Sequence, residues 1–305
     1  MSKVIITGGS GFIGKNLISA LSVLDAEIFI LTRNPGIVSL HNNIRYVVCD
    51  LHNHSDVKNI INSIQASHLL HLAWSLSPSN YDLPENFDWL KTSINLLEEF
   101  QKNNGQRVIM IGSGFEYDWN YGYCSEDITP TSNNNLYSAS KNILREFAFT
   151  YCKFHGLEIV WPRLFFLYGP HEHPKKLVAE IITSLLRGVS VTVNNGEIYR
   201  DYMYVKDTVN ILSKLLFDNY NGVINISTGI PTKLGDIAKL AADIIGRPEL
   251  LKIGRPEKVK NQVVYANVDK LNYQLSLYPK YDLKTGLQET VDWWKDFDKK
   301  KQAFL

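Results

Sequence analysis

The chain has 305 residues, with 32 basic and 31 acidic side chains. This length suffices for a large buried core, or for one doubly wound domain that carries a smaller lobe. The two charges nearly cancel, and the one marked run of a single sign is Lys299–Lys301 beside the C-terminus. Binding to nucleic acid or to a membrane surface needs a concentrated positive field. We therefore expect neither as a partner.

Three cysteines, Cys49, Cys124 and Cys152, lie far apart with no CxxC spacing. This pattern predicts neither a disulfide framework nor a thiolate zinc site, and it fits a reducing compartment. The apolar stretch at Val4–Ile6 is too short for a signal peptide, and no window of about 18 apolar residues follows. We expect a cytoplasmic protein. His171, Glu172 and His173 share one loop and give no distributed ligand set, so no metal is expected.

Short apolar strands alternate with amphipathic helices from residue 3 to about 165. Strands are expected at 3–7, 27–32, 45–49, 68–72, 107–112 and 158–163, with helices near 12–23, 55–65, 86–103 and 137–155 between them. Such apolar strands, separated by helices, indicate a parallel sheet that is covered on both faces. The sequence predicts an α/β fold with a doubly wound, Rossmann-type parallel sheet.

The remainder of the chain is less regular. It contains a Tyr168–Pro170 turn, strands expected at 190–193 and 223–227, and helices near 175–187, 206–217, 233–246 and 284–297. We expect this part to form a smaller C-terminal lobe over the carboxyl edge of the sheet, where such folds bind ligands.

The segment Val4–Gly14 runs from a strand through a string of glycines into a helix. Glycines at this point let the backbone turn sharply and approach a pyrophosphate, which the N–H groups of the helix start can hold. The string satisfies both the GxGxxG and the GxxGxxG spacing. Its position in the first strand–helix turn predicts a dinucleotide site.

Arg33 follows the second strand, where NAD-preferring sheets usually carry an acidic residue. An arginine there accommodates a 2′-phosphate, so Arg33 favours NADP, although an ordinary exposed arginine is the alternative. Asp50 closes the third strand. It can accept a hydrogen bond from the adenine amino group, or it can cap the next helix.

Tyr137 and Lys141 are four residues apart at the start of a predicted helix, so both side chains lie on one face. A tyrosine with its ordinary pKa near 10 is a poor acid or base until a nearby ammonium lowers that value. Lys141 can supply this ammonium. Taken alone, the pair is equally compatible with a surface contact.

The pair belongs to a series that occurs in one order: Thr7–Gly14, His71–Ala73, Ser113 before Tyr117, Tyr137 with Lys141, Tyr168–Pro170, Arg200–Tyr202, Ala266–Lys270 and Trp293–Trp294. This series resembles the extended short-chain dehydrogenase/reductases, specifically the sugar-nucleotide epimerases, dehydratases and reductases. The resemblance spans nearly the whole chain.

The resemblance implies roles for individual residues. Ser113 would hydrogen-bond the reacting oxygen, Tyr137 would give or take its proton, and Lys141 would hold the nicotinamide ribose and tune the tyrosine. The cofactor would contact Gly8, Ser10, Gly11, Phe12, Ile13, Gly14, Arg33, Asp50, Leu51, Leu72, Ala73, Lys141 and Phe165. The substrate, a nucleotide sugar, would contact Ser113, Gly114, Phe115, Arg200 and Arg255, the arginines holding the diphosphate. For Arg255 a surface salt bridge is the alternative.

The same resemblance implies domains and assembly. Residues 1–165 with about 200–222 would bind the dinucleotide, and 166–199 with 223–305 would bind the nucleotide sugar. A homodimer would form through the helices near 86–103 and 137–155.

Departures from the family patterns discriminate among reactions. In 4,6-dehydratases an Asp-Glu pair follows the residue matching Ser113, and here Gly114 and Phe115 stand there. Fucose-synthase-type epimerase-reductases place a cysteine at Phe115. Phe166 and Trp89 replace two further family asparagines, so their sugar and phosphate contacts do not carry over.

We therefore expect a reductase of a nucleotide-linked 4-keto-6-deoxyhexose, with Tyr137 as proton donor. The preferred cofactor is NADP(H), and NAD(H) is possible. The product would serve cell-surface polysaccharide such as the O-antigen of lipopolysaccharide. The alternative is an NAD-dependent nucleotide-sugar 4-epimerase, and a third reading is a non-catalytic NADP sensor.

Overall fold

The computed structural model describes residues 1–34, 39, 41–75, 81–254 and 261–303. Contacts divide the chain into two units. The first unit comprises 1–116, 130–163 and 209–224, and the second comprises 117–129, 164–208 and 225–305. These bounds differ from the expected ranges mainly at 117–129 and 200–208, which belong to the second unit.

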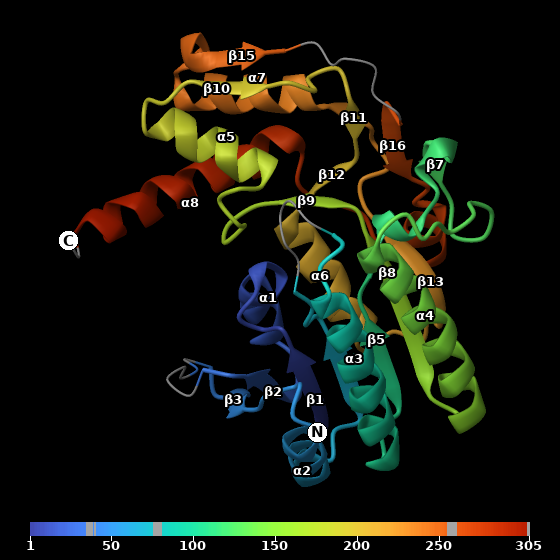
Figure 1. The fold of residues 1–305 in the computed structure, drawn as a ribbon. Helices are drawn as coiled ribbons and strands as arrows, with labels where there is room; N and C mark the ends of the chain where they lie inside the picture. Colours follow the sequence, from blue (N-terminus) through green and yellow to red (C-terminus); the bar gives the residue numbers. More distant parts are fainter. Residues whose placement is uncertain (35–38, 40, 76–80, 255–260, 304–305) are drawn as a thin grey trace. The chain divides into compact units, whose positions relative to one another are not determined.

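The first unit is built on one sheet of eight described strands (Figure 1). Its order is β3-β2-β1-β4-β5-β8-β13, with β6 paired to β8. The strands are β1 (Ser2–Thr7), β2 (Ala26–Thr32), β3 (Ile44–Val48), β4 (His68–His71), β5 (Arg107–Met110), β6 (Gly112–Ser113), β8 (Glu158–Leu164) and β13 (Gly222–Ile226). The pairings from β3 through β8 are parallel. The expected fold class is confirmed.

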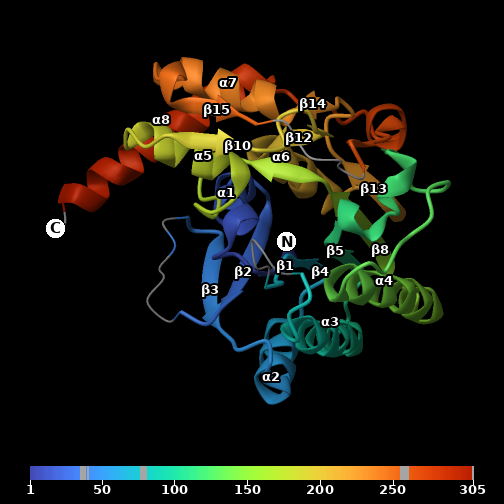
Figure 2. The ribbon, with the colours of Figure 1, turned by 45° about the horizontal axis from the view of Figure 1, so that its top comes forward.

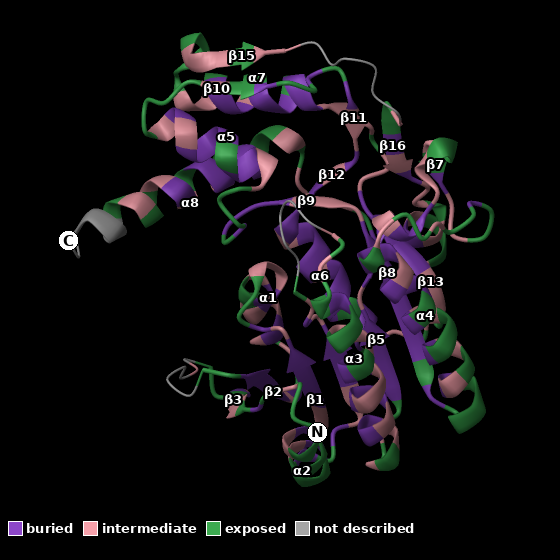
Figure 3. Cartoon of the chain, in the orientation of Figure 1, coloured by how far each residue is buried: buried purple, intermediate pink, exposed green. Residues whose placement is uncertain are grey.

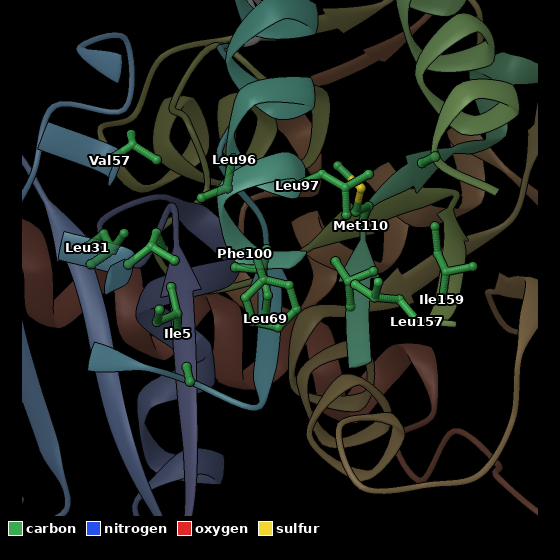
Figure 4. Close-up of a cluster of buried hydrophobic side chains, with 14 of the residues drawn as sticks. Ile5, Leu31, Val57, Leu69, Leu96, Leu97, Phe100, Met110, Leu157 and Ile159 are labelled. Carbon is green, nitrogen blue, oxygen red and sulfur yellow. The ribbon is translucent and has the colours of Figure 1, made fainter. Parts of the chain in front are cut away.

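Helices cover both faces of this sheet (Figure 2). One face carries α2 (His54–Ile64), α3 (Glu85–Lys102) and α4 (Leu136–His155), and the other carries α1 (Phe12–Leu21). A core cluster joins the first face to its helices. In Figure 4, Ile5 and Leu69 from the strands lie beside Leu96 and Phe100 from α3. The strands are mostly buried, and the outer faces of α3 and α4 are exposed (Figure 3).

The start of α2 settles one of the two alternatives for Asp50. The side chain of Asn53 caps this helix by accepting from the N–H groups of Ser55 and Asp56. Asp50 is exposed, and its carboxylate accepts from the His52 N–H instead. The alternative that Asp50 caps the helix is therefore wrong, because the N-cap is Asn53, three residues later.

The second unit contains short strands and three longer helices. Its helices are α5 (Leu177–Leu186), α7 (Leu234–Ile245) and α8 (Leu283–Ala303); α6 (Val205–Leu215) begins in this unit and ends in the first. Its sheets are β10-β15, β14-β11-β16-β7 and β12-β9. These strands are β7 (Tyr123–Cys124), β9 (Phe166–Tyr168), β10 (Val191–Val193), β11 (Tyr199–Arg200), β12 (Tyr202–Tyr204), β14 (Thr232–Lys233), β15 (Leu251–Ile253) and β16 (Val263–Ala266).

Short helical turns complete the chain: η1 (Gly114–Glu116), η2 (Trp119–Tyr121), η3 (Pro248–Leu250) and η4 (Lys270–Gln274). Across the described ranges, no helix combines the length and the apolar character that a membrane crossing demands.

Candidate active site

The site begins where the strand order of the sheet reverses, between β1 and β4. In doubly wound sheets, ligands bind at the carboxyl ends of the strands at this point. The β1–α1 turn lies against the end of β4: a Cβ on Gly8 would stand 2.7 Å from the Ala73 nitrogen, and Gly8 has a φ of +73°. A Cβ on Gly14 would stand 2.4 Å from the Gly8 carbonyl oxygen. Both positions therefore require glycine.

Hydrogen bonds hold the ends of β1 and β4 together. The Thr7 hydroxyl bonds His71 Nδ1 at 2.7 Å and accepts from the Ala73 N–H at 3.2 Å. His71 Nε2 bonds the Ser93 hydroxyl of α3 at 2.8 Å. Burial, and then the charge of Lys141, lower the pKa of His71 to about 3, so the ring is neutral. The ring of His71 thus links β4, on which it lies, to β1 and to α3 by hydrogen bonds.

The start of α1 fits the diphosphate of a dinucleotide. Gly11 occupies the N-cap without a side-chain cap, and no acidic residue stands in the first turn. The first N–H groups of a helix have no partner within it, and they carry the positive end of its dipole. Ser10 and Gly11 are exposed, while Phe12 and Ile13 are half-buried.

The other residues expected at the cofactor lie at strand ends. Leu72 and Ala73 follow β4. Leu51 follows β3 in the sequence and packs against the core cluster. Arg33 follows β2 and is exposed. Phe165 lies in the second unit, where its ring centroid is 6.1 Å from that of Tyr117.

Local hydrogen bonds fix the first turn of α4. Asn135 caps the helix and forms a capping box with Ser138. The Leu136 N–H donates to the Asp82 carboxylate at 2.8 Å, and the Tyr137 N–H donates to the Tyr81 carbonyl at 3.0 Å. These contacts set the position of the Tyr137 side chain.

Ser113 and Tyr137 form a hydrogen-bonded pair. The Ser113 hydroxyl accepts from the Phe115 N–H at 3.2 Å, and it lowers the pKa of Tyr137 through a hydrogen bond to the phenol. Burial has the larger effect and holds the pKa of Tyr137 well above its ordinary value. The phenol therefore keeps its proton at neutral pH.

Lys141 lies one turn further along α4 and is buried. Its ammonium donates to the Ile111 carbonyl at 2.8 Å and stands 3.8 Å from the centre of the Trp74 ring. The distance to the Tyr137 ring centre is 6.0 Å. Burial lowers the pKa of Lys141 to about 7. Both protonation states are thus populated near neutral pH.

Three aromatic rings surround the Tyr137 ring. Their centroids lie at 6.1 Å for Trp74, 5.9 Å for Tyr81 and 6.3 Å for Phe115. Asn86 holds the Trp74 indole by a hydrogen bond of 2.9 Å. Sequence reasoning missed Trp74 and Tyr81. The signal for Trp74 was its place directly after His71–Ala73.

Arg200 lies in the second unit, whereas Ser113, Tyr137 and Lys141 belong to the first. Its guanidinium carbon stands 5.3 Å from the Trp119 ring centre and 5.7 Å from that of Phe166, and Nη1 donates to the carbonyls of Tyr199 and Asn261. Arg255 lies outside the described residues. Within the described ranges, no group of His, Cys, Asp or Glu has a metal-binding arrangement.

The fold and site define an NAD(P)-dependent enzyme of the extended short-chain dehydrogenase/reductase type. Residues 4–227 match the NAD dependent epimerase/dehydratase family, and the chain belongs to that family.

The relatives differ in their reactions. The chain is 25% identical to UDP-glucuronic acid decarboxylase 1 of Xenopus tropicalis, covering 96% of this chain and 72% of that one. It is 25% identical to a putative UDP-glucose 4-epimerase of Methanocaldococcus jannaschii, covering 96% and 98%. The structure of the Thermus thermophilus UDP-glucose 4-epimerase complex with NAD has the same fold, with a TM-score of 0.84, 23% identity and coverage of 96% and 99%.

A further similar structure is the Methanobrevibacter ruminantium UDP-N-acetylglucosamine 4-epimerase in complex with UDP-N-acetylmuramic acid. Its TM-score is 0.85 at 25% identity, covering 97% of this chain and 99% of that one.

The packing of the glycine turn predicts the effect of adding one methyl group. Gly14→Ala places a Cβ against backbone atoms of Gly8 and Gly9, and should cost about 1–3 kcal/mol in the free energy of unfolding. In the matched variant Gly11→Ala, the nearest atom is 3.3 Å away and the cost should be smaller. Urea denaturation without cofactor measures both. Equal stabilities of Gly14→Ala and the wild type would contradict the packing argument.

Proposed function

We propose that the chain is an NADPH-dependent reductase of a nucleotide-linked 4-keto-6-deoxyhexose. The observation that carries this proposal is the buried Ser113–Tyr137 pair, in which the pKa of the phenol is raised by burial. The phenol holds a proton at neutral pH and can pass it to the carbonyl oxygen, because hydride addition turns that oxygen into a strongly basic alkoxide. Reduction needs such a donor in its first step, whereas oxidation of a hydroxyl needs a base.

The chain's own residues would act on the carbonyl oxygen. The Ser113 hydroxyl orients that oxygen by a hydrogen bond, and Tyr137 donates its proton to it as negative charge develops. Lys141 stands one helical turn away, and it would hold the cofactor ribose. The bound reduced dinucleotide supplies the hydride to the carbon, so the C=O group gains one hydride and one proton.

The side chains around Tyr137 favour a 6-deoxy substrate. Gly114 and Phe115 occupy the positions of the dehydratase acid/base pair, and neither can transfer a proton. The rings of Phe115, Tyr81 and Trp74 instead give Tyr137 largely apolar neighbours. A methyl group at C6 suits such surroundings better than a hydroxyl or a carboxylate, because burial of an unpaired polar group is costly.

The second candidate is an NAD-dependent nucleotide-sugar 4-epimerase. The names of the relatives support it, because a putative 4-epimerase of Methanocaldococcus jannaschii matches over 96% of this chain. The Ser113–Tyr137–Lys141 set could serve that reaction too. The presence of Tyr137 and Lys141 weighs against a non-catalytic NADP sensor, which has no need of either.

We also propose a homodimer formed through α3 and α4. Large apolar side chains are exposed on these helices: Phe87 at 61%, Ile143 at 52% and Phe147 at 42%. Cys49, Cys124 and Cys152 form no disulfide, which suits the reducing cytoplasm. The product would supply cell-surface polysaccharide such as the O-antigen of lipopolysaccharide.

A substrate panel tests the reaction. The enzyme is incubated with NADPH and the UDP-, CDP-, GDP- and dTDP-linked 4-keto-6-deoxyhexoses, and loss of absorbance of the reduced nicotinamide is followed. We expect stoichiometric oxidation of NADPH with one of them. A parallel incubation with nucleotide hexoses and NAD⁺ tests 4-epimerisation. Turnover there, with no reduction of any keto sugar, would replace the reductase by the epimerase.

Tyr137→Phe removes the phenolic hydroxyl and keeps the ring. Since general acid catalysis is worth about 10²–10⁴-fold, kcat and kcat/KM should both fall by that factor. Affinity for NADPH and the melting temperature should change little. Tyr273→Phe, at a tyrosine that is 76% exposed, is the matched control. A Tyr137→Phe enzyme with near wild-type kcat would remove Tyr137 as proton donor.

Arg33→Ala tests the choice of cofactor. Only NADPH carries the 2′-phosphate, and a charge-assisted contact is worth about 1.5–3 kcal/mol, so the affinity for NADPH should fall roughly 10- to 100-fold. The affinity for NADH should stay nearly constant. Arg45→Ala, at an exposed arginine of β3, is the control for loss of a positive charge. Equal losses for the two cofactors would refute the NADP assignment.

A further inference from the structure

Glu116 is a charged residue inside the first unit. It ends the turn η1, three positions after Ser113, and none of its surface is exposed. A buried carboxylate is costly unless it is paired and hydrogen-bonded. The proposed chemistry uses no group of this residue. Its partners therefore indicate what the carboxylate does.

Two residues of β8 hold the carboxylate. Arg163 Nε donates to Oε2 at 2.8 Å, and Trp161 Nε1 lies 3.0 Å from Oε1 and 3.1 Å from Oε2. Arg163 and Trp161 are themselves almost fully buried. Arg145 of α4 faces the same carboxylate, with its Nε 3.9 Å from Oε2. These contacts compensate the charge and fix the side chain.

The same carboxylate reaches the backbone of the catalytic serine. Glu116 Oε1 accepts from the Ser113 N–H at 2.7 Å. Gly112 leaves the space for this contact, since a Cβ there would stand 2.1 Å from Trp161 Nε1 and 2.5 Å from Glu116 Oε1. Ser113 is thus held against β8 by a side chain, at the residue whose hydroxyl bonds Tyr137.

The backbone of Glu116 is tied to α4. Its carbonyl accepts from the Ser132 N–H at 2.8 Å and from Asn142 Nδ2 at 3.3 Å. Asn142 directly follows Lys141 on the helix. One residue therefore connects β8, the serine turn and the helix that carries the tyrosine and the lysine.

The charge of Glu116 also acts on both of these groups. It raises the pKa of Lys141, against the larger lowering by burial, and it raises the pKa of Tyr137. Lys141 also faces His71 of β4, which is neutral, the ring of Trp74, and Tyr137 itself. Tyr81 and Ser113 also face Tyr137. The carboxylate thus favours the protonated forms of both the lysine and the tyrosine.

We propose that Glu116 is a positioning residue of the active site, which holds the Ser113 backbone against β8 and whose carboxylate acts electrostatically on the Tyr137–Lys141 pair. This inference rests on the proposed catalytic use of these three residues. It assigns to Glu116 no contact with substrate or cofactor.

Two variants separate the electrostatic effect of Glu116 from its hydrogen bond to the Ser113 N–H. Glu116→Gln removes the charge and keeps an oxygen that can accept from the Ser113 N–H. Glu116→Val with Arg163→Met removes the carboxylate and the guanidinium together, so that the Arg163 charge is not left buried without its partner. Glu99→Gln is the matched control, since Glu99 is another buried glutamate of the first unit, paired with Lys102.

Each variant is expected to change the kinetics in a different way. In Glu116→Gln the basic limb of the pH–kcat profile should move to lower pH, because Lys141 and Tyr137 lose their protons more easily without the carboxylate. In the double variant kcat should fall about 10-fold or more with little change in KM, because Ser113 loses its anchor. Glu99→Gln should keep the wild-type profile. Wild-type kcat and limb position in both variants, with only a lower melting temperature, would overturn the proposal.

A spectroscopic readout works without knowledge of the substrate. In protein labelled with ¹³C at lysine Cε, the shift of Lys141, assigned from the spectrum of Lys141→Met, reports its protonation. We expect a lower pKa of Lys141 in Glu116→Gln than in the wild type. In Glu99→Gln the pKa of Lys141 should equal that of the wild type. An unchanged pKa would refute the electrostatic part of the proposal. If the wild type reduces none of the sugars tested, the proposed function fails, and this titration still decides the effect of Glu116.

Discussion

The first turn of α4 is the constraint on which the active site depends. A helix leaves its first N–H groups without partners inside the helix, and here those groups serve as anchors. Asp82 and the Tyr81 carbonyl take the N–H groups of Leu136 and Tyr137, and Asn135 caps the turn. With that turn fixed, the helical repeat places Tyr137 and Lys141 on one face. The remaining groups of the site are arranged around this face.

Burial then determines the protonation of the site. It raises the pKa of Tyr137, lowers that of Lys141 to about 7, and keeps His71 neutral. All three effects have one cause, since a poorly solvated environment disfavours the charged form of each group. In such surroundings a hydrogen bond or a fixed charge acts more strongly than it does in water. A carboxylate as well paired as Glu116 can persist there and act on its neighbours.

Much of the first unit could be predicted from the sequence, because its strands and helices are long enough to show a period. The strand of Lys3–Thr7, the glycine turn and the helix that begins near Tyr137 are examples. In the second unit the sequence also predicted α5, α7, α8 and β10, but strands such as Tyr199–Arg200 and Thr232–Lys233 were missed because they have two residues each. The assignment of residues 117–129 to that unit depends on contacts such as the hydrogen bond from Tyr117 to Asn225, 108 positions away.

The residues of the site, too, could be predicted only in part from the sequence. Ser113, Tyr137 and Lys141 could be named because their types and spacing follow a known pattern, and the structure brings Ser113 and Tyr137 into hydrogen-bond contact. For Trp74 the only signal was its place directly after His71–Ala73. Tyr81 could not be named, because a linear sequence does not show that its carbonyl meets an N–H 56 residues later. Of the two alternatives for Asp50, capping of α2 is excluded for a local reason, since Asn53 caps the helix at its actual start.

The ties between the segment after β4 and the start of α4 have a consequence for protein engineering. That segment lies between two strands of the sheet in sequence and is an obvious piece to exchange when substrate range is to be altered. Tyr81 and Asp82 belong to it, yet their partners Tyr137 and Leu136 belong to α4. A grafted segment would therefore bring different hydrogen-bond acceptors to the start of α4 and displace Tyr137. A transplant that respects this architecture has to move Tyr81, Asp82 and Asn86 together with the first turn of α4 as one module.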